Sequence, residues 1–340
     1  MIQKNKFAYL FLIVILIALS GCGGGSTSNT VTGTGAEAGA GAAEEPADQE
    51  LEEVTVAIAA SGIAYGPMYL AQEENIWAKY GLKVNLSSMD VAAATAGVIT
   101  GDVPIAFGGA NVVDAAVKTD KVKLTGTIGS IPFMLYAKNI DKVEDLKGKV
   151  VGVSAPGSNP EYAILTLVRS IGMEPRKDVE ILYIGNTGLA AISEGKVEAS
   201  LLVPPMSFQA DDMGLKKVAT MSELDGIKGL YMIGAVHQPY AEKNPEVIEN
   251  FYKAYAEASS LAKTEKEATM EALSKWTKVT DMEALDGAYE YFKAYWPTDL
   301  HVPESEIQFL LDELAATTNP AAKDVNPEDI LDNRYADAVE

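Results

Sequence analysis

The sequence predicts an α/β protein in which layers of helix surround a mainly parallel β-sheet. Three observations lead to this class. From Val54 onwards, short β-branched or apolar runs alternate with helical segments. The part of the chain that can fold is about 290 residues long, which suits two domains or two lobes. After Pro245 the strand signals disappear and the pattern becomes helical.

The chain begins with an export signal. Lys4 and Lys6 precede the apolar run Phe7–Leu19, which is too short for a stable membrane-spanning helix, and Leu19-Ser20-Gly21-Cys22 follows. We therefore expect residues 1–21 to be a signal peptide that is removed. The run ending at Cys22 resembles the lipobox of bacterial lipoproteins, and this resemblance implies that the Cys22 sulfur is acylated and anchors the mature protein to a membrane. An ordinary signal peptide or a short anchor is the alternative.

Residues 22–52 form the predicted tether. They are rich in Gly, Ser, Thr and Ala, turn acidic towards Glu50, and contain almost no large apolar side chain before the first strand. Such a segment cannot bury enough surface to fold. A flexible chain of this length has a root-mean-square reach of about 30 Å, which would hold the body near the membrane without fixing its orientation.

The expected strands are short apolar or β-branched runs bounded by turn residues. They are Val54–Ala60, Lys83–Leu86, Ile105–Phe107, Lys123–Ile128, Phe133–Ala137, Val150–Val153, Glu180–Ile184, Ser200–Val203, Lys217–Ala219 and Tyr231–Ala235.

Helices are expected in most of the gaps between these strands. Asn159-Pro160-Glu161 is typical of a helix start, with Asn as the N-cap, Pro at the first helical position and an acid in the first turn. Asn244-Pro245-Glu246 repeats this pattern and opens a helical region over Glu246–Leu314. We expect the aromatic residues of that region to pack in the core rather than bind a ligand.

Composition and charge exclude several functions. The whole chain carries a net charge of −21. Residues 1–21 contain Lys4 and Lys6 and no acid, so their removal leaves −23, and nucleic acid is not an expected partner. An acidic surface also disfavours attachment to anionic lipid, which leaves the acyl group as the expected membrane contact. Cys22 is the only cysteine, so no disulfide, thiolate metal site or redox pair is expected in the body.

Candidate binding residues follow from the rule that ligands of open α/β sheets bind beyond the carboxyl ends of the strands. Helix N-termini present free N–H groups there. The loops selected in this way supply the candidate ligand-binding residues Ser61, Gly62, Tyr65, Gly108, Gly109, Asn111, Ser130, Phe133, Gly157, Ser158, Asn159, Glu161, Asn186, Thr187 and Pro204.

Each candidate also has a purely structural interpretation. Gly108 and Gly109 can form a tight turn, Ser158 and Asn159 can cap a helix, and Tyr65 can pack rather than stack on a ligand. Glu161 can complement a helix dipole; if it faces the cleft, it favours a cationic or donor-bearing ligand over an anion. These loops contain no Arg or Lys, so an anion would have to be held by backbone N–H groups, hydroxyls and helix dipoles.

Four segments in order resemble a known family. They are GPMYLAQEENIWAKYGLKVNL (66–86), GDVPIAFGGAN (101–111), DLKGKVVGVSAPGS (145–158) and GKVEASLLVPP (195–205), and the ending DILDNRY (329–335) is also similar. These segments are similar to those of the SsuA/THI5-like, NMT1-like solute-binding proteins for nitrate, taurine, alkanesulfonates and thiamine precursors.

The resemblance implies a type II periplasmic-binding-protein fold with two crossings between its lobes. Lobe one would comprise residues 53–138 and 232–340, and lobe two residues 139–231. The chain would then be the substrate-binding component of an ABC importer, a monomer that captures a small organic solute and delivers it to a permease with its ATPase. The solute would be a sulfonate-like anion or a nitrogen heterocycle such as a thiamine-pyrimidine precursor.

Two other functions stay open at this point. A lipid-anchored sensor would use the same cleft to present its closed form to a receptor. A thiamine-pyrimidine biosynthetic enzyme, as found in part of the family, is disfavoured because the chain lacks the cysteine-rich motif and because His237 and His301 have no catalytic partners at a suitable spacing. We expect no catalytic residue, cofactor or metal. The expected location is the cell envelope, either periplasmic or on the outer face of the cytoplasmic membrane, with the outer membrane also open.

Overall fold

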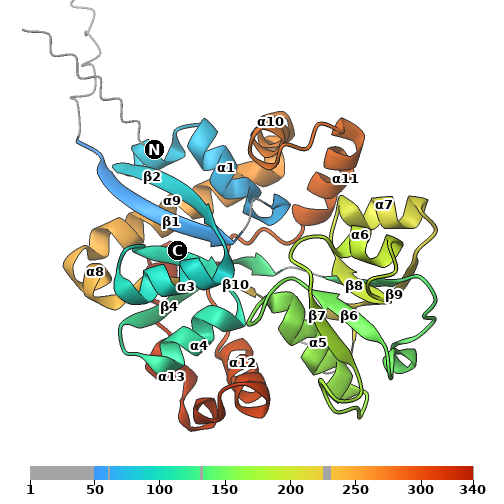
Figure 1. Cartoon of the computed structure of the whole chain (residues 1–340). Coiled ribbons are helices and arrows are strands. Elements are labelled where there is room, and N and C mark those ends of the chain that lie inside the picture. The colour runs from blue at the N-terminus through green and yellow to red at the C-terminus, as the bar shows by residue number, and fades with distance from the viewer. Residues whose placement is uncertain (1–49, 60–61, 131–132, 225–230, 340) are drawn as a thin grey trace, which may run out of the picture. The chain divides into compact units, whose positions relative to one another are not determined.

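The computed structural model describes residues 50–59, 62–130, 133–224 and 231–339. The expected signal peptide, Cys22 and all but the last residues of the tether lie outside the described residues, as does Ser61. Two five-stranded sheets, together with their helices, belong to one compact unit, Asp48–Glu340. Figure 1 shows the elements of the two sheets as two groups.

The first sheet has the strand order β2-β1-β3-β10-β4. Its strands are β1 (Glu52–Ala59), β2 (Leu82–Met89), β3 (Ile105–Gly108), β4 (Val122–Ser130) and β10 (Tyr231–His237). β1 is parallel to β2 and β3, whereas β10 is antiparallel to both of its neighbours.

The second sheet repeats this arrangement with the order β7-β6-β8-β5-β9. Its strands are β5 (Met134–Ala137), β6 (Val150–Val153), β7 (Glu180–Tyr183), β8 (Ala199–Leu202) and β9 (Lys216–Thr220). β6 is parallel to β7 and β8, and β5 is antiparallel to β8 and β9. In each sheet four strands share one direction, and the reversed strand is the one that follows a crossing from the other sheet.

The first crossing comes earlier than the sequence suggested. The expected lobe boundary at residue 138 placed Met134–Ala137 in lobe one, but these residues form β5 of the second sheet. Their pairing with β8 and β9 explains the difference, because a strand with apolar residues at every position fits the middle of a sheet. The second crossing precedes β10, close to the expected boundary at residue 231.

The helices of the first half are short and follow the strands. They are η1 (Ile63–Tyr65), α1 (Gly66–Glu73), α2 (Ile76–Lys79), α3 (Val91–Thr100), α4 (Ala110–Lys118), η2 (Val143–Leu146), α5 (Asn159–Ser170), α6 (Gly188–Ser193), α7 (Met206–Asp212) and η3 (Met221–Glu223).

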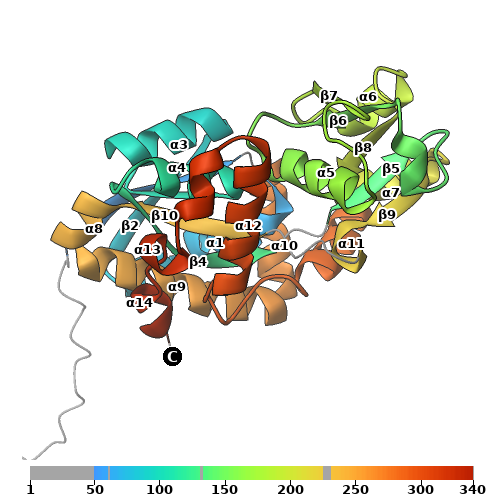
Figure 2. The same ribbon diagram turned by 90° about the horizontal axis from the view of Figure 1, so that it is seen from below.

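The helices of the C-terminal part return to the first sheet and extend to α5. They are α8 (Gln238–Lys243), α9 (Pro245–Thr264), α10 (Lys266–Thr277), α11 (Met282–Phe292), α12 (Glu304–Thr317), η4 (Pro320–Asp324), α13 (Pro327–Ile330) and α14 (Arg334–Asp337). Figure 2 shows α12 between the first sheet and α5.

Alternation along the strands builds the core. In β1, Val54, Val56 and Ile58 face the cluster that contains α1, α2 and α9, whereas Ala57 faces the cluster with α3 and α4. The second cluster continues without a break into Val151 and Val153 of β6 and the apolar face of α5. The two sheets therefore share apolar packing on one side, and the loops on their strand ends are held close to each other.

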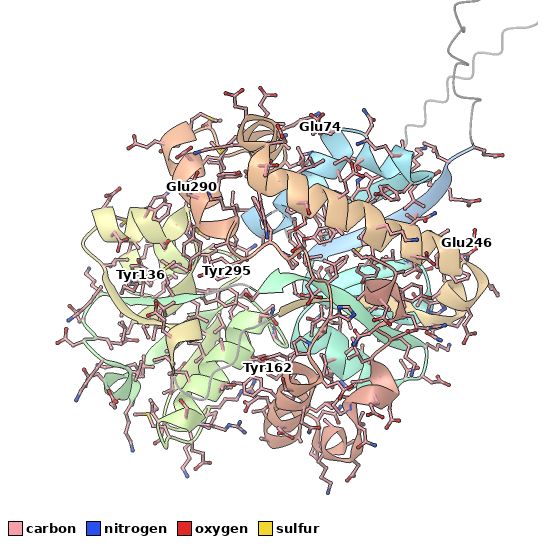
Figure 3. All side chains as sticks on the ribbon, turned by 180° about the vertical axis from the view of Figure 1, so that it is seen from behind. Glu74, Tyr136, Tyr162, Glu246, Glu290 and Tyr295 are labelled. Carbon is pink, nitrogen blue, oxygen red and sulfur yellow. The ribbon has the colours of Figure 1, made fainter. Side chains whose placement is uncertain are left out.

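Acidic side chains lie on the outside of this core. Glu246 of α9, Glu290 of α11 and Glu74, which directly follows α1, are exposed and lie on the surface (Figure 3). Within the described residues, no helix is long and apolar enough to cross a membrane.

Candidate functional site

A cavity of about 430 Å³ lies where the carboxyl ends of the parallel strands of both sheets meet. This is the position at which open α/β sheets bind ligands. The described residues that line it are Gly62, Ile63, Ala64, Tyr65, Met89, Asp90, Val91, Gly108, Gly109, Asn111, Phe133, Ser154, Ala155, Ser158, Asn159, Pro160, Gly185, Asn186, Val203, Met232 and Phe292. Most of these residues lie at or after the ends of β1, β2 and β3 of the first sheet and β6, β7 and β8 of the second, so both sheets form the wall.

The turn between β3 and α4 brings the backbone to the cavity. Asn111 folds back on this turn: its Oδ1 accepts a hydrogen bond from the Gly109 N–H at 2.9 Å, and its Nδ2 donates to Thr95 Oγ1 at 2.9 Å. A Cβ at Gly108 would lie 2.7 Å from the Asn111 amide. Glycine at this position thus allows the asparagine to close the turn over the helix N-terminus.

The start of α5 faces this turn from the second sheet. The helix begins at Asn159, so Ser158 rather than Asn159 occupies the N-cap position, and the Ser158 Oγ donates back to the Ala155 carbonyl at 2.6 Å. The Asn159 side chain is therefore free to reach across. Its Oδ1 accepts from the Ala110 N–H of α4 at 3.3 Å, and its Nδ2 contacts the Met232 Sδ at 3.6 Å. One buried asparagine thus joins the loops of the two sheets.

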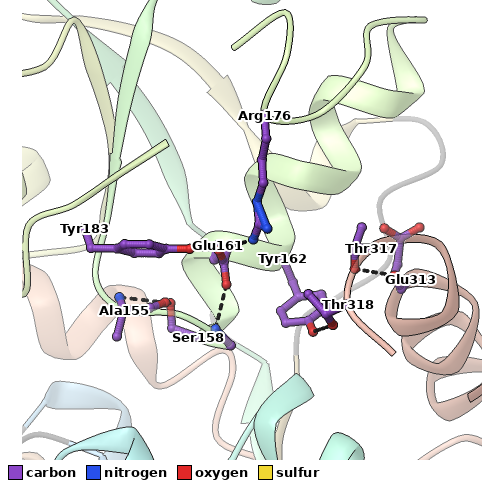
Figure 4. Close-up of polar contacts among 10 residues, drawn as sticks. Ala155, Ser158, Glu161, Tyr162, Arg176, Tyr183, Glu313, Thr317 and Thr318 are labelled. Atoms are coloured by element: carbon purple, nitrogen blue, oxygen red, sulfur yellow. Dashed lines mark hydrogen bonds and ion pairs between the residues drawn. The ribbon is translucent and has the colours of Figure 1, made fainter. Parts of the chain in front are cut away.

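Glu161 lies behind the cavity wall, contrary to the expectation that it contacts a ligand. Its side chain is 1% exposed. Its carboxylate accepts hydrogen bonds from the Gly157 N–H at 2.6 Å and the Tyr183 hydroxyl at 2.5 Å, and pairs with Arg176 at 2.5 Å (Figure 4). Burial and the Glu161 carboxylate together raise the pKa of Tyr183 to about 12. These bonds fix the loop between β6 and α5 and use the charge of Glu161 internally.

Apolar side chains make up most of the remaining wall. Tyr65, Phe133 and Phe292 contribute aromatic rings that are at least nine-tenths buried. Met232 and the partly buried Met89 add flexible thioethers, which adapt to the shape of a bound molecule. The wall suits an organic solute with an apolar body.

Asp90 is the one charged residue among the described lining residues. It is exposed and forms the N-cap of α3, where its Oδ1 accepts from the Ala93 N–H at 2.8 Å. No Lys, Arg or His occurs in this described lining. The fixed charge at the cavity is therefore negative.

The structure brings nine of the predicted site residues to the cavity. They are Gly62, Tyr65, Gly108, Gly109, Asn111, Phe133, Ser158, Asn159 and Asn186. Five others do not line it: Ser130, Gly157, Glu161, Thr187 and Pro204. Thr187 borders a separate surface hollow beside α6 and α7.

Sequence reasoning missed several lining residues, chiefly Met89, Asp90, Val91, Met232 and Phe292. The loop after β2 was missed because the strand was expected to end at Leu86, whereas it continues through the polar Ser87-Ser88 to Met89. The N-cap signal of Asp90, an acid directly before a helical run, could have found it. Phe292 carries no local signal, because only the packing of the C-terminal helices brings it to the cavity.

A second set of polar contacts joins α5 to the C-terminal helices of the first sheet. The Tyr162 hydroxyl lies 2.9 Å from Thr318 Oγ1 (Figure 4). Thr166 Oγ1 donates to Glu313 at 2.8 Å, and Arg169 pairs with the same carboxylate. Glu313 is 3% exposed, whereas the Arg169 side chain is about a third exposed, so only the carboxylate of this pair is withdrawn from water.

The histidines lie away from the cavity. The His237 Nδ1 donates to the Val98 carbonyl at 3.0 Å, and His301 lies between Asp299 and Asp337. Within the described residues, no group of His, Cys, Asp or Glu is arranged to hold a metal ion.

A family model and two curated proteins match this chain. The model of the family described as "NMT1/THI5 like" matches residues 63–268. The taurine-binding periplasmic protein of Escherichia coli is 29% identical over 214 residues, which cover 60% of this chain and 65% of that protein. A putative aliphatic sulfonates-binding protein of the same organism is 27% identical over 199 residues, covering 56% and 57%. The chain thus aligns with less than two thirds of the length of these curated relatives.

Solved structures share the fold at low sequence identity. The alkanesulfonate-binding protein of Xanthomonas axonopodis, solved with MOPS, superposes with a TM-score of 0.68 at 15% identity, covering 84% of this chain and 99% of that one. A desulfurization enzyme superposes with a TM-score of 0.60 at 14% identity over 85% of this chain and 98% of that one. The periplasmic-binding-protein fold expected from the sequence is thereby confirmed.

Proposed function

Because the chain belongs to the NMT1/THI5-like family, we propose that it is the solute-binding component of an ABC importer. It captures a small organic solute in the cavity between the two sheets and delivers it to a membrane permease driven by an ATPase. The observation that carries this proposal is the cavity of about 430 Å³ whose wall comes from the strand ends of both sheets. A solute there touches both halves at once.

A solute that contacts both halves can stabilise a closed form of the protein. A ligand shifts an equilibrium between open and closed forms only by its difference in affinity for the two. We propose two lobes, one built on each sheet, that separate to admit the solute. The two connections between the sheets, from β4 to β5 and into β10, form the hinge. The closed form is the one that the permease recognises.

The proposed solute contacts are the cavity residues that the sequence also selected. They are Gly62, Tyr65, Gly108, Gly109, Asn111, Phe133, Ser158, Asn159 and Asn186, to which we add Asp90, Met232 and Phe292. Backbone and amide groups would orient the solute, and the rings and thioethers would cover its apolar surface.

Saturable binding with closure tests this function. The full-chain protein, purified without refolding, is denatured and the released small molecules are identified by mass spectrometry. The recovered solute, together with taurine, an alkanesulfonate, nitrate and an aminopyrimidine, is then titrated by calorimetry, and small-angle scattering follows the radius of gyration. We expect saturable heat with at least one compound and a smaller radius on binding. No recovered solute and no heat with any compound would refute the proposal.

We further propose that the protein is a lipoprotein held at the cell envelope through Cys22, with residues 23–52 as its tether. The taurine-binding relative, which is named as periplasmic, supports export, and the lipobox-like run ending at Cys22 supports the lipid. Mass spectrometry of the mature N-terminus should find a diacylglyceryl modification on Cys22. An unmodified N-terminus at another residue would contradict it.

We propose that the protein does not turn its solute over. The curated relatives are named as binding proteins, whereas one structural neighbour is named as an enzyme. Among the described residues that line the cavity, Asp90 is the single charged side chain, and one exposed carboxylate offers no acid and base pair. Recovery of the bound solute unchanged after prolonged incubation checks this point, and appearance of a product would overturn it.

A further inference from the structure

The fixed charges around the cavity restrict the class of solute that it can hold. The one charged residue in the described lining is the acidic Asp90. The three arginines of the chain are all engaged elsewhere: Arg176 pairs with Glu161, Arg169 with Glu313, and Arg334 with Asp332. None of the three lines the cavity, so no guanidinium is available there to clamp an anion.

Backbone N–H groups are the other means of holding an anion, and at the start of α4 two of them are already used. Anions bind to helix N-termini through N–H groups that have no partner within the helix. Here the Gly109 N–H donates to Asn111 at 2.9 Å and the Ala110 N–H donates to Asn159 at 3.3 Å. Both asparagines are part of the wall, so an anion that used these two N–H groups would have to displace a side chain of the protein itself.

The start of α3 places a negative group at the cavity. The Ala93 N–H donates to Asp90 at 2.8 Å, and this carboxylate lies at the positive end of the helix dipole. An arriving sulfonate or nitrate would therefore meet a negative group at this helix start. The Glu161 carboxylate, in contrast, is buried behind the wall and paired with Arg176.

We infer that the cavity selects a neutral or cationic solute with an apolar body and excludes sulfonate-type and nitrate-type anions. This inference rests on the proposed function. Asp90 accepts a hydrogen bond from an N–H group of the solute through its Oδ2, since its Oδ1 caps α3. The rings and thioethers of Phe133, Phe292 and Met232 cover the apolar part of the solute. The chain thus differs in selectivity from the relatives named for taurine and sulfonates.

A charge series on one ring tests the inference. Benzamidine, benzamide, benzoate and benzenesulfonate share a phenyl ring and carry a positive, a neutral and two negative groups. They are titrated by calorimetry into the full-chain protein after removal of any bound solute. We expect benzamidine and benzamide to bind at least about tenfold more tightly than either anion, because the anions meet an unpaired carboxylate and no cation. The solute recovered from the purified protein should likewise carry no net negative charge at pH 7.

Two different failures can be told apart. If an anion of the series binds as tightly as benzamide, or if the recovered solute is a sulfonate or carboxylate, the charge inference is overturned and the solute-binding function stands. If no compound of the series binds at millimolar concentration and no solute is recovered, the inference is overturned together with the proposed function.

A conservative variant tests the role of Asp90. Asp90→Asn removes the charge and keeps an N-cap side chain for α3, so the fold is retained. We expect the affinity for benzamidine to fall by about tenfold more than the affinity for benzamide, because both lose a hydrogen-bond acceptor but only benzamidine also loses an opposite charge. Asp102→Asn is the matched control, because Asp102 is an exposed acid near the other end of α3 that bonds to Thr100 and does not line the cavity. An unchanged preference for benzamidine in Asp90→Asn would refute the role of Asp90.

Discussion

Gly109 and Asn159 lie so close together that a single methyl group should prevent the two halves of the cavity from closing. A Cβ built on Gly109 would lie 1.3 Å from Asn159 Oδ1, 2.1 Å from Cγ and 2.5 Å from Nδ2. Ordinary contact begins at about 3.4 Å. In Gly109→Ala the two loops must therefore part by about 2 Å, or Asn159 must leave its position.

The loss of binding free energy in Gly109→Ala follows from the contacts that the variant cannot make. A separation of about 2 Å breaks the 3.3 Å hydrogen bond between Ala110 and Asn159, a loss of about 1 kcal/mol. The solute loses contact with one wall; if this equals two buried methylene groups, it adds roughly 1.5 kcal/mol. The total of about 2.5 kcal/mol corresponds to a weakening of the dissociation constant by somewhat less than a hundredfold.

The assay is calorimetric titration of the recovered solute into wild type and variants, with urea unfolding in parallel. Gly109→Ala should lose most of its affinity and change the free energy of unfolding by less than about 1 kcal/mol, since the contact lies between loops and not within a core. Gly62→Ala is the matched control in the same cavity, because a Cβ there meets nothing within 4 Å. It should bind like wild type.

The double variant Gly109→Ala/Asn159→Ala separates the clash from a change in the backbone of the turn. Alanine at 159 removes all three of the atoms that the new methyl group meets. Affinity should recover to that of Asn159→Ala alone, which lacks only the hydrogen bond. Wild-type affinity in Gly109→Ala, or no recovery in the double variant, would refute the reasoning.

Two further predictions concern stability and pH. Glu313→Ala leaves Arg169 without its partner and should lower the free energy of unfolding in urea by about 2 kcal/mol, a value reduced because Arg169 is about a third exposed. The exposed Asp312→Ala on the same helix should change it by less than about 0.5 kcal/mol, and equal effects would contradict the role of the pair. Hydrogen bonds to Asp337 and Asp299 raise the pKa of His301 above its ordinary value of 6.5. The stability from His301 is therefore complete below pH 6.5 and is lost as pH rises through the raised pKa. An NMR titration should show this raised pKa fall in Asp337→Asn, and a wild-type value at or below 6.5 would contradict the prediction.

Local patterns were sufficient to predict the strands. Each of the ten expected runs overlaps one observed strand, because buried strands of an α/β sheet are short, apolar and bounded by turns. Pairing was harder to predict. Met134–Ala137 reads like any buried strand, and nothing within it shows that it joins the second sheet and runs against its neighbours. That assignment depends on partners more than 60 residues away in β8 and about 80 away in β9.

The same limit separates the site residues that could be predicted from those that could not. Gly108, Gly109 and Asn111 follow a strand directly, so the strand-end rule finds them. Met232 and Phe292 come from a reversed strand and a late helix, and only the packing of distant segments brings them to the cavity. Glu161 lies in a segment that the strand-end rule selects, but its carboxylate bonds to Arg176 and Tyr183 instead of lining the cavity.

The asparagines show most clearly why the charge of the solute could not be predicted from the sequence. An asparagine beside a helix start can cap its own helix, bond to a ligand or bond to another loop, and the spacing is the same in all three cases. Here Asn111 bonds back to the turn before its own helix and Asn159 bonds to the other loop, and together they occupy two N–H groups at the start of α4. The sequence shows that cationic side chains are missing from the loops, and only the structure shows that these two N–H groups are also taken. A chain related to sulfonate-binding proteins can therefore keep the fold and the position of the cavity while its polar groups select a solute of different charge.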